Sequence, residues 1–109
     1  MAIPIIHTIA TGTTQGTYEL PTDAGFEYRG GKSTFAFSGA TNAFTNLTSM
    51  KIQASFDDSN WIYLTDSADS PVSFDDATIL TVDIGKCKLR FEAVVASGGI
   101  LGDITITVS

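Results

Sequence analysis

Histidine and cysteine are almost absent from this chain of 109 residues, which has one of each, His7 and Cys87. A single cysteine excludes an internal disulfide, and with it the disulfide-stapled scaffolds typical of small secreted domains. Two such side chains also fall short of the ligand set that zinc usually takes. His7 is the only candidate base for a nucleophile–histidine–acid arrangement, and it lies near a chain end, where residues are commonly mobile. We therefore expect no catalytic residues, no metal ligands and no cofactor.

Basic residues are scarce as well, because six Lys and Arg stand against twelve Asp and Glu, for a net charge of −6. A surface that follows nucleic-acid phosphates needs clustered positive charge, whereas these six residues are scattered singly. No segment approaches the roughly 20 apolar residues of a membrane span, and the first residues lack the basic start of a signal peptide. We expect a protein made in the cytoplasm that binds neither nucleic acid nor a membrane.

The composition of the chain is typical of β-strands, with 43% hydrophobic residues, 17% charged residues and abundant Thr and Ser. This balance excludes intrinsic disorder. Apolar and polar residues alternate with a period of two, and turn residues separate the runs about every ten residues, whereas helical periodicity is missing. The pattern predicts an all-β fold, an antiparallel, jelly-roll-like β-sandwich of about seven to eight short strands. The predicted strands include residues 33–38, 49–56, 61–65, 77–83, 87–95 and 103–108, with an earlier one around Tyr18 and Leu20.

The first 16 residues differ from the rest of the chain. They start with an apolar group containing Ile3, Ile5 and Ile6 and continue into a Gly- and Thr-rich stretch. We divide the chain into an N-terminal arm, residues 1–16, and a single β-sandwich domain, residues 17–109. The arm has two interpretations: an edge strand joined to the body by a flexible loop, or a segment that docks on a neighbouring chain. In the second case Ile3, Ile5 and Ile6 are the contact residues.

Aspartates gather in the expected turns, at positions 57, 58, 66, 69, 75 and 76. Asp side chains in turns commonly accept hydrogen bonds from the local backbone, which is the simpler interpretation. A calcium site needs several converging oxygen ligands, and the Asp-x-Asp-x-Asp-Gly loop that supplies them is not present. We therefore interpret these residues as turn formers and keep calcium as the alternative.

Trp61 and Tyr63 fall on one face of the strand predicted over residues 61–65. Core or inter-subunit packing is one explanation for two aromatic residues on one face. The other is an exposed aromatic platform on which sugar rings stack, since exposed apolar surface commonly marks a binding site.

Two segments of the chain resemble a pattern in small β-sandwich proteins of tailed-phage virions, the capsid decoration or cement proteins. The first runs Met50-Lys51-Ile52-Gln53-Ala54-Ser55-Phe56-Asp57-Asp58-Ser59-Asn60-Trp61-Ile62-Tyr63-Leu64, and the second is Cys87-Lys88-Leu89-Arg90-Phe91. In the family, a strand ending in Ser-x-Asp-Asp/Gly leads into a Trp strand, and a later strand carries a Leu-Arg-Phe-like core. The resemblance implies a virion protein, a homo-trimer seated on the major capsid protein at the outer capsid surface, where it stabilises the assembled head.

The function predicted from the sequence is thus a non-enzymatic capsid decoration protein. The alternative is a small carbohydrate-binding β-sandwich module of a phage fibre or receptor-binding type, with Trp61 and Tyr63 as its platform. Discoidin-like carbohydrate-binding domains show a similar Ser-x-Asp-x-x-x-Trp hairpin, although they are usually longer jelly rolls.

Overall fold

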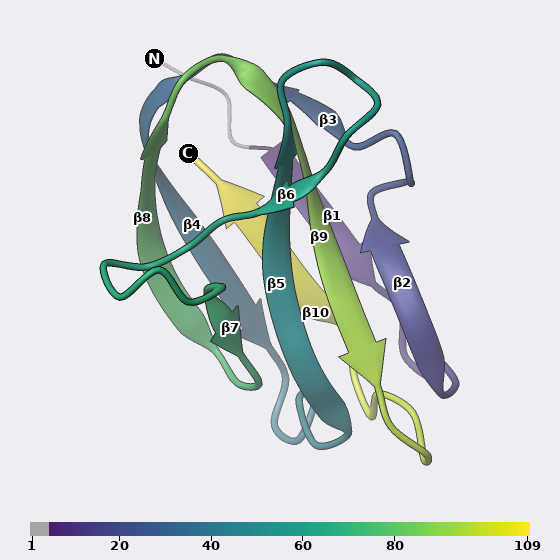
Figure 1. Cartoon of the computed structure of the whole chain (residues 1–109). Helices are drawn as coiled ribbons and strands as arrows, with labels where there is room; N and C mark the ends of the chain where they lie inside the picture. The colour runs from purple at the N-terminus through teal and green to yellow at the C-terminus, as the bar shows by residue number, and fades with distance from the viewer. Residues whose placement is uncertain (1–4) are drawn as a thin grey trace.

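A computed structural model describes residues 5–109, which form two packed layers of antiparallel strands (Figure 1). The strands of this part of the chain are β1 Ile5–Ile9, β2 Gly16–Leu20, β3 Phe26–Tyr28, β4 Gly31–Gly39, β5 Leu47–Ser55, β6 Ile62–Tyr63, β7 Ser73–Phe74, β8 Thr78–Ile84, β9 Cys87–Val95 and β10 Ile104–Val108. Within the same residues, no helix is long and apolar enough to cross a membrane.

The two sheets have the strand order of a jelly roll. One sheet, here called sheet A, runs β1-β10-β4-β8, and the other, sheet B, runs β2-β9-β5-β6. Strand β3 also pairs with β9, and β7 also pairs with β5, so each continues an interrupted neighbour along the same partner strand. Counting β2 with β3 and β6 with β7 gives two four-stranded sheets. Successive strands alternate between the layers, except that β5 and the β6–β7 strand after it both lie in sheet B, as in jelly-roll sandwiches. The predicted fold class is confirmed.

Strict alternation explains why the central strands form where the sequence predicts them. Along β9 every second residue from Cys87 to Val95 is buried, and the residues between them are half-buried. Strand β10 repeats the pattern, with Ile104, Ile106 and Val108 buried between two threonines. Because successive side chains of a strand point to opposite faces, each of these segments can place its apolar set between the sheets only in an extended conformation.

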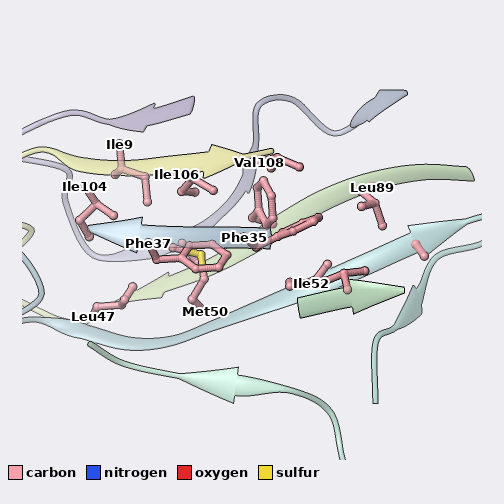
Figure 2. Close-up of a cluster of buried hydrophobic side chains, with 14 of the residues drawn as sticks. Ile9, Phe35, Phe37, Leu47, Met50, Ile52, Leu89, Ile104, Ile106 and Val108 are labelled. Carbon is pink, nitrogen blue, oxygen red and sulfur yellow. The ribbon is translucent and has the colours of Figure 1, made fainter. Parts of the chain in front are cut away.

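Phenylalanine rings from both layers meet in the centre of the sandwich. The ring centroid of Phe91, in sheet B, lies 5.9 Å from that of Phe35 and 5.6 Å from that of Phe37, both in sheet A. The ring centroid of Phe26, in β3 of sheet B, lies 5.7 Å from that of Phe91, with the two rings tilted by 33°. The contacts of Phe91 with Phe35 and Phe37 are edge-to-face, an arrangement that is favourable beyond the area that it buries. Figure 2 shows Phe35 and Phe37 beside Met50, Ile52 and the β10 side chains that complete this core.

Phe56 is an exception to the predicted pattern. Alternation from Met50 through Ile52 and Ala54 assigns Phe56 to the buried face, but its side chain is 63% exposed. Strand β5 ends at Ser55, and the turn that begins at Asp57 takes the chain out of the sheet before Phe56 can be covered. The following strand is also shorter than predicted, since only Ile62 and Tyr63 pair with β5.

Phe91→Ala tests the central ring contacts. Removing a ring that is fully buried between the two sheets should lower the free energy of unfolding by about 3–5 kcal/mol. The measurement is urea denaturation followed by far-UV circular dichroism. The matched control is Leu101→Ala, because Leu101 is 55% exposed and its truncation should cost less than about 0.5 kcal/mol. Equal losses in the two variants would contradict the central role of Phe91.

Candidate functional site

Trp61 lies over the outer side of sheet B. The segment between β5 and β6, residues 56–61, passes outside β9 before the chain returns to pair with β5 (Figure 1). The Arg90 guanidinium, which projects outward from β9, lies 4.1 Å from the centre of the Trp61 ring. The ring also abuts Gly25 so closely that an added Cβ there would come within 2.8 Å of it. Trp61 therefore fastens this segment to its own sheet.

Polar side chains continue from Arg90 across the same face. Arg90 Nε donates to Gln53 Oε1 at 2.5 Å, and its guanidinium also donates to the carbonyl oxygen of Asp23 at 2.7 Å. Glu92 accepts a hydrogen bond from the Tyr63 hydroxyl, which lies 3.0 Å from each carboxylate oxygen. Gln53 points away from the core and is nevertheless only 7% exposed, because these neighbours cover it. These residues form a hydrogen-bonded network on the outer side of sheet B. We call Gln53, Tyr63, Arg90 and Glu92 the Arg90–Glu92 network.

Tyr63 is the more accessible of the two aromatic residues, at 36% exposure. The Lys51 ammonium lies 5.2 Å from the centre of its ring. The hydrogen bond to Glu92, together with partial burial, raises the pKa of Tyr63 above its usual value, so the phenol remains a neutral donor at physiological pH. Both predicted platform residues thus lie on the outer side of sheet B, and each carries a cation over its ring.

The acidic turns use their carboxylates to bind the chain's own amide groups. Asp57 accepts hydrogen bonds from the backbone N–H groups of Ser59 and Asn60, at 3.0 and 2.8 Å, and from the Asn60 side chain at 2.6 Å. Asp66 accepts in the same way from Ala68 and Ser70. These contacts fit the interpretation of the aspartates as turn formers. Among the described residues, no group of three or more His, Cys, Asp and Glu could hold a metal ion.

The hydrogen bonds to Asp57 hold the pKa of its carboxyl group well below the usual value, with the Asn60 backbone contributing most. Cys87, in contrast, is buried at the start of β9, and this burial raises the pKa of its thiol. A thiol in this state carries little of the nucleophilic thiolate.

Of the three isoleucines predicted as contacts of the N-terminal arm, two lie in β1 and one precedes it. Ile3 lies outside the described residues. Ile5 and Ile6 begin β1, which pairs along its whole length with β10 of the same chain, so that Ile5 is opposite Val108 and Ile6 is opposite Thr107. His7 follows in the same strand, opposite Ile106. Strand β1 is an edge strand of sheet A.

The outer side of sheet A differs from that of sheet B in its chemistry. Because Phe35 and Phe37 point inward from β4, the residues between and beside them point outward, and the same rule holds for β10 and β8. The strand registers then place the outward residues in rows: Thr8–Thr105–Ser38, Thr107–Ala36–Ile79, Thr34–Thr81 and Lys32–Asp83. Charge is confined to the last row. We call the first three rows the hydroxyl face.

A shallow hollow lies at one end of the sandwich, with a volume of about 420 Å³. The turn from Gly39 to Thr45 and the two residues Asp76 and Ala77 line it. Its only ionisable side chain is that of Asp76, so it does not bring acid, base and nucleophile together.

The sequence placed Trp61 and Tyr63 on one face of a strand but did not show that Gln53, Arg90 and Glu92 lie beside them, nor that the outward Thr and Ser residues line up as the hydroxyl face. The alternation of Thr and Ser was visible in each strand, whereas the rows depend on which strands lie side by side. Searches against protein-family models, curated proteins and solved structures find no match to this chain.

Trp61→Ala tests whether the indole fastens the segment over sheet B. Loss of the Arg90 stack and of the partly buried ring should lower the free energy of unfolding by about 1–3 kcal/mol. Urea denaturation measures the loss, with Ile62→Ala as the control, because Ile62 is the neighbouring residue and is 62% exposed. A Trp61→Ala variant as stable as the wild type would contradict the role of the indole in holding residues 56–61 on sheet B.

Asp57 makes stability depend on pH in the acid range. Its folded-state pKa lies below the unfolded value of about 3.8, so its contribution is complete above that value and is lost as the pH falls toward the folded pKa. The urea midpoint of the wild type should therefore decrease between pH values of about 5 and 3 more steeply than that of Asp57→Asn. Asp75→Asn, in another exposed bend, is the matched control for the loss of one surface carboxylate. Parallel curves for the wild type and Asp57→Asn would contradict the assignment.

Proposed function

We propose that this chain is a non-enzymatic structural protein of a tailed-phage virion, which binds the outer surface of the capsid and stabilises the assembled head. The observation that carries the proposal is the contrast between the two outer faces of the sandwich. The central part of the outer side of sheet B is occupied by its own 56–61 segment and by the Arg90–Glu92 network. The hydroxyl face of sheet A is uncharged over three rows, on a chain whose net charge is −6.

An uncharged face of methyl and hydroxyl groups suits contact with another protein. Charged residues are depleted at the centres of protein interfaces, because their desolvation is costly. Threonine and serine hydroxyls both donate and accept hydrogen bonds, so they can pair with many backbone and side-chain groups of a partner. Ile79, which is 76% exposed at the end of the second row, adds apolar area. A protein that binds the assembled shell and not its free subunits stabilises the shell by mass action.

The jelly-roll fold is compatible with both functions considered, since it occurs in viral capsid proteins and in lectins. The surroundings of the aromatic residues favour the structural role over sugar binding. Arg90 covers one face of Trp61, whose ring also abuts Gly25, and Lys51 lies over the ring of Tyr63, so each ring has less surface free for stacking on a sugar. The homo-trimer and the contacts of Ile3, Ile5 and Ile6 remain predictions from the sequence.

Co-sedimentation tests the proposal with the purified chain and the heads of the phage that encodes it. We expect the chain to sediment with assembled heads and not with unassembled major capsid protein. Thr34→Glu places a charge in the hydroxyl face and should weaken binding at least tenfold, because a buried unpaired charge is costly. Thr17→Glu is the matched control, since Thr17 is exposed on the outer side of β2 in sheet B. Both variants should keep the wild-type circular dichroism spectrum.

Equal binding by the two variants would reject the hydroxyl face as the contact. If the wild type does not bind heads and a glycan array shows sugar binding that Tyr63→Ala abolishes, the carbohydrate-binding function replaces the proposal.

A further inference from the structure

We propose that the open edge of β8 pairs with the β8 edge of a second copy of this chain, antiparallel and about a two-fold axis at Thr81. This inference starts from the edge of sheet A and does not rest on capsid binding. It assigns a dimer in place of the homo-trimer that the resemblance implies. It starts from the order of the strands, in which β8 ends sheet A and pairs only with β4.

The other sheet edges are short or interrupted, as is usual where edge pairing is avoided. Strand β1 has five residues, the β2–β3 edge is broken at Pro21, and β6 and β7 have two residues each, with Pro71 in the loop between them. Strand β8 has seven residues, Thr78–Ile84, in continuous register with β4 and without proline, lysine or a bulge. A long, regular edge of this kind is a template for another strand.

The hydrogen bonds of Thr34 reveal which backbone groups of β8 point outward. Thr34 N–H donates to the Ser109 carbonyl at 2.8 Å, and Ser109 N–H donates to the Thr34 carbonyl at 3.0 Å. Both polar groups of Thr34 therefore point toward the β10 side of β4. Opposite residues in an antiparallel pair exchange both hydrogen bonds or neither, so Thr81, which faces Thr34, directs its N–H and C=O toward the open edge.

Alternation gives the backbone groups of Ile79 and Asp83 the same outward direction as those of Thr81. No backbone hydrogen bond from the exposed 65–71 loop, or from any other described segment outside β4, reaches β8. The backbone N–H and C=O groups of Ile79, Thr81 and Asp83 can therefore donate and accept hydrogen bonds with a strand that lies along the open edge.

When β8 pairs with itself about Thr81, no like charges lie opposite one another. With a two-fold axis at that residue, Thr81 pairs with the partner's Thr81, and Ile79 pairs with the partner's Asp83. The one charge of the strand therefore meets no like charge across the axis, and cross-strand Thr pairs are favourable. On the inner side Leu80, which is half-buried, faces the partner's Val82 and gains apolar cover. These features fit a second copy of this chain rather than an unrelated strand.

Light scattering coupled to size exclusion tests the pairing. The wild type should have twice the chain mass of 11.5 kDa and should dissociate on dilution. Thr81→Pro removes the outward N–H of Thr81 but no hydrogen bond to β4. Edge strands tolerate proline where the N–H points away from the sheet. This variant should therefore have the single-chain mass and an unchanged circular dichroism spectrum. Thr81→Ala retains the N–H and should remain a dimer. A wild type with one or three times the chain mass at every concentration would overturn the proposal.

A charge-swap experiment keeps the proposal testable if Thr81→Pro does not fold. Thr81→Glu and Thr81→Lys each place like charges directly opposite at the axis, so each variant alone should have the single-chain mass. Their equimolar mixture should recover twice the chain mass, because Glu then faces Lys across the two-fold. A mixture that stays at the single-chain mass, or variants that each dimerise as the wild type does, would exclude the pairing at Thr81.

Discussion

The contact between Phe91 of sheet B and the two phenylalanines of β4 holds the layers of this protein together. The Phe91 ring meets Phe35 and Phe37 at right angles or nearly so, and all three are almost completely buried. Once these rings face inward, the pleat of each strand directs the neighbouring residues outward. Thr34, Ala36 and Ser38 therefore form one outer surface, while Arg90 and Glu92 form the other.

The two outer surfaces are chemically different for this reason, although both belong to the same small sandwich. On the outer side of sheet B, Trp61 of the 56–61 segment lies against Arg90, and Tyr63 donates a hydrogen bond to Glu92, so both charged neighbours of Phe91 are bonded within the chain. Sheet A presents hydroxyl and methyl groups in register across four strands. A rigid sheet that presents an uncharged face is well suited to docking.

The edges of the sheets add a second kind of surface. Three of them are short or broken, whereas β8 is long, regular and open on one side. Its row of outward backbone groups is continuous with the hydroxyl face, so pairing of two β8 edges would extend sheet A into one sheet with a single outer face. Edge pairing and face docking would then act together, because two copies present twice the docking area in a fixed orientation.

Local sequence was sufficient for the fold class and for the long strands, whereas the short strands β3 and β7 were not predicted. The alternation of apolar and polar residues over 87–95 and 103–108 predicts extended segments with one buried face. Gly, Asp and Asn mark the turns between the strands. Aspartates such as Asp57 were also predictable as turn formers, since their hydrogen bonds reach only two or three residues along the chain.

The surroundings of Trp61 and the threonine rows depend on pairing between distant segments of the chain. Trp61 meets Arg90 and Gly25 only because residues 56–61 pass over β9, and the threonine rows exist only because β10 lies between β1 and β4. No spacing in the chain encodes those neighbours, because cross-strand contacts depend on the register between distant segments.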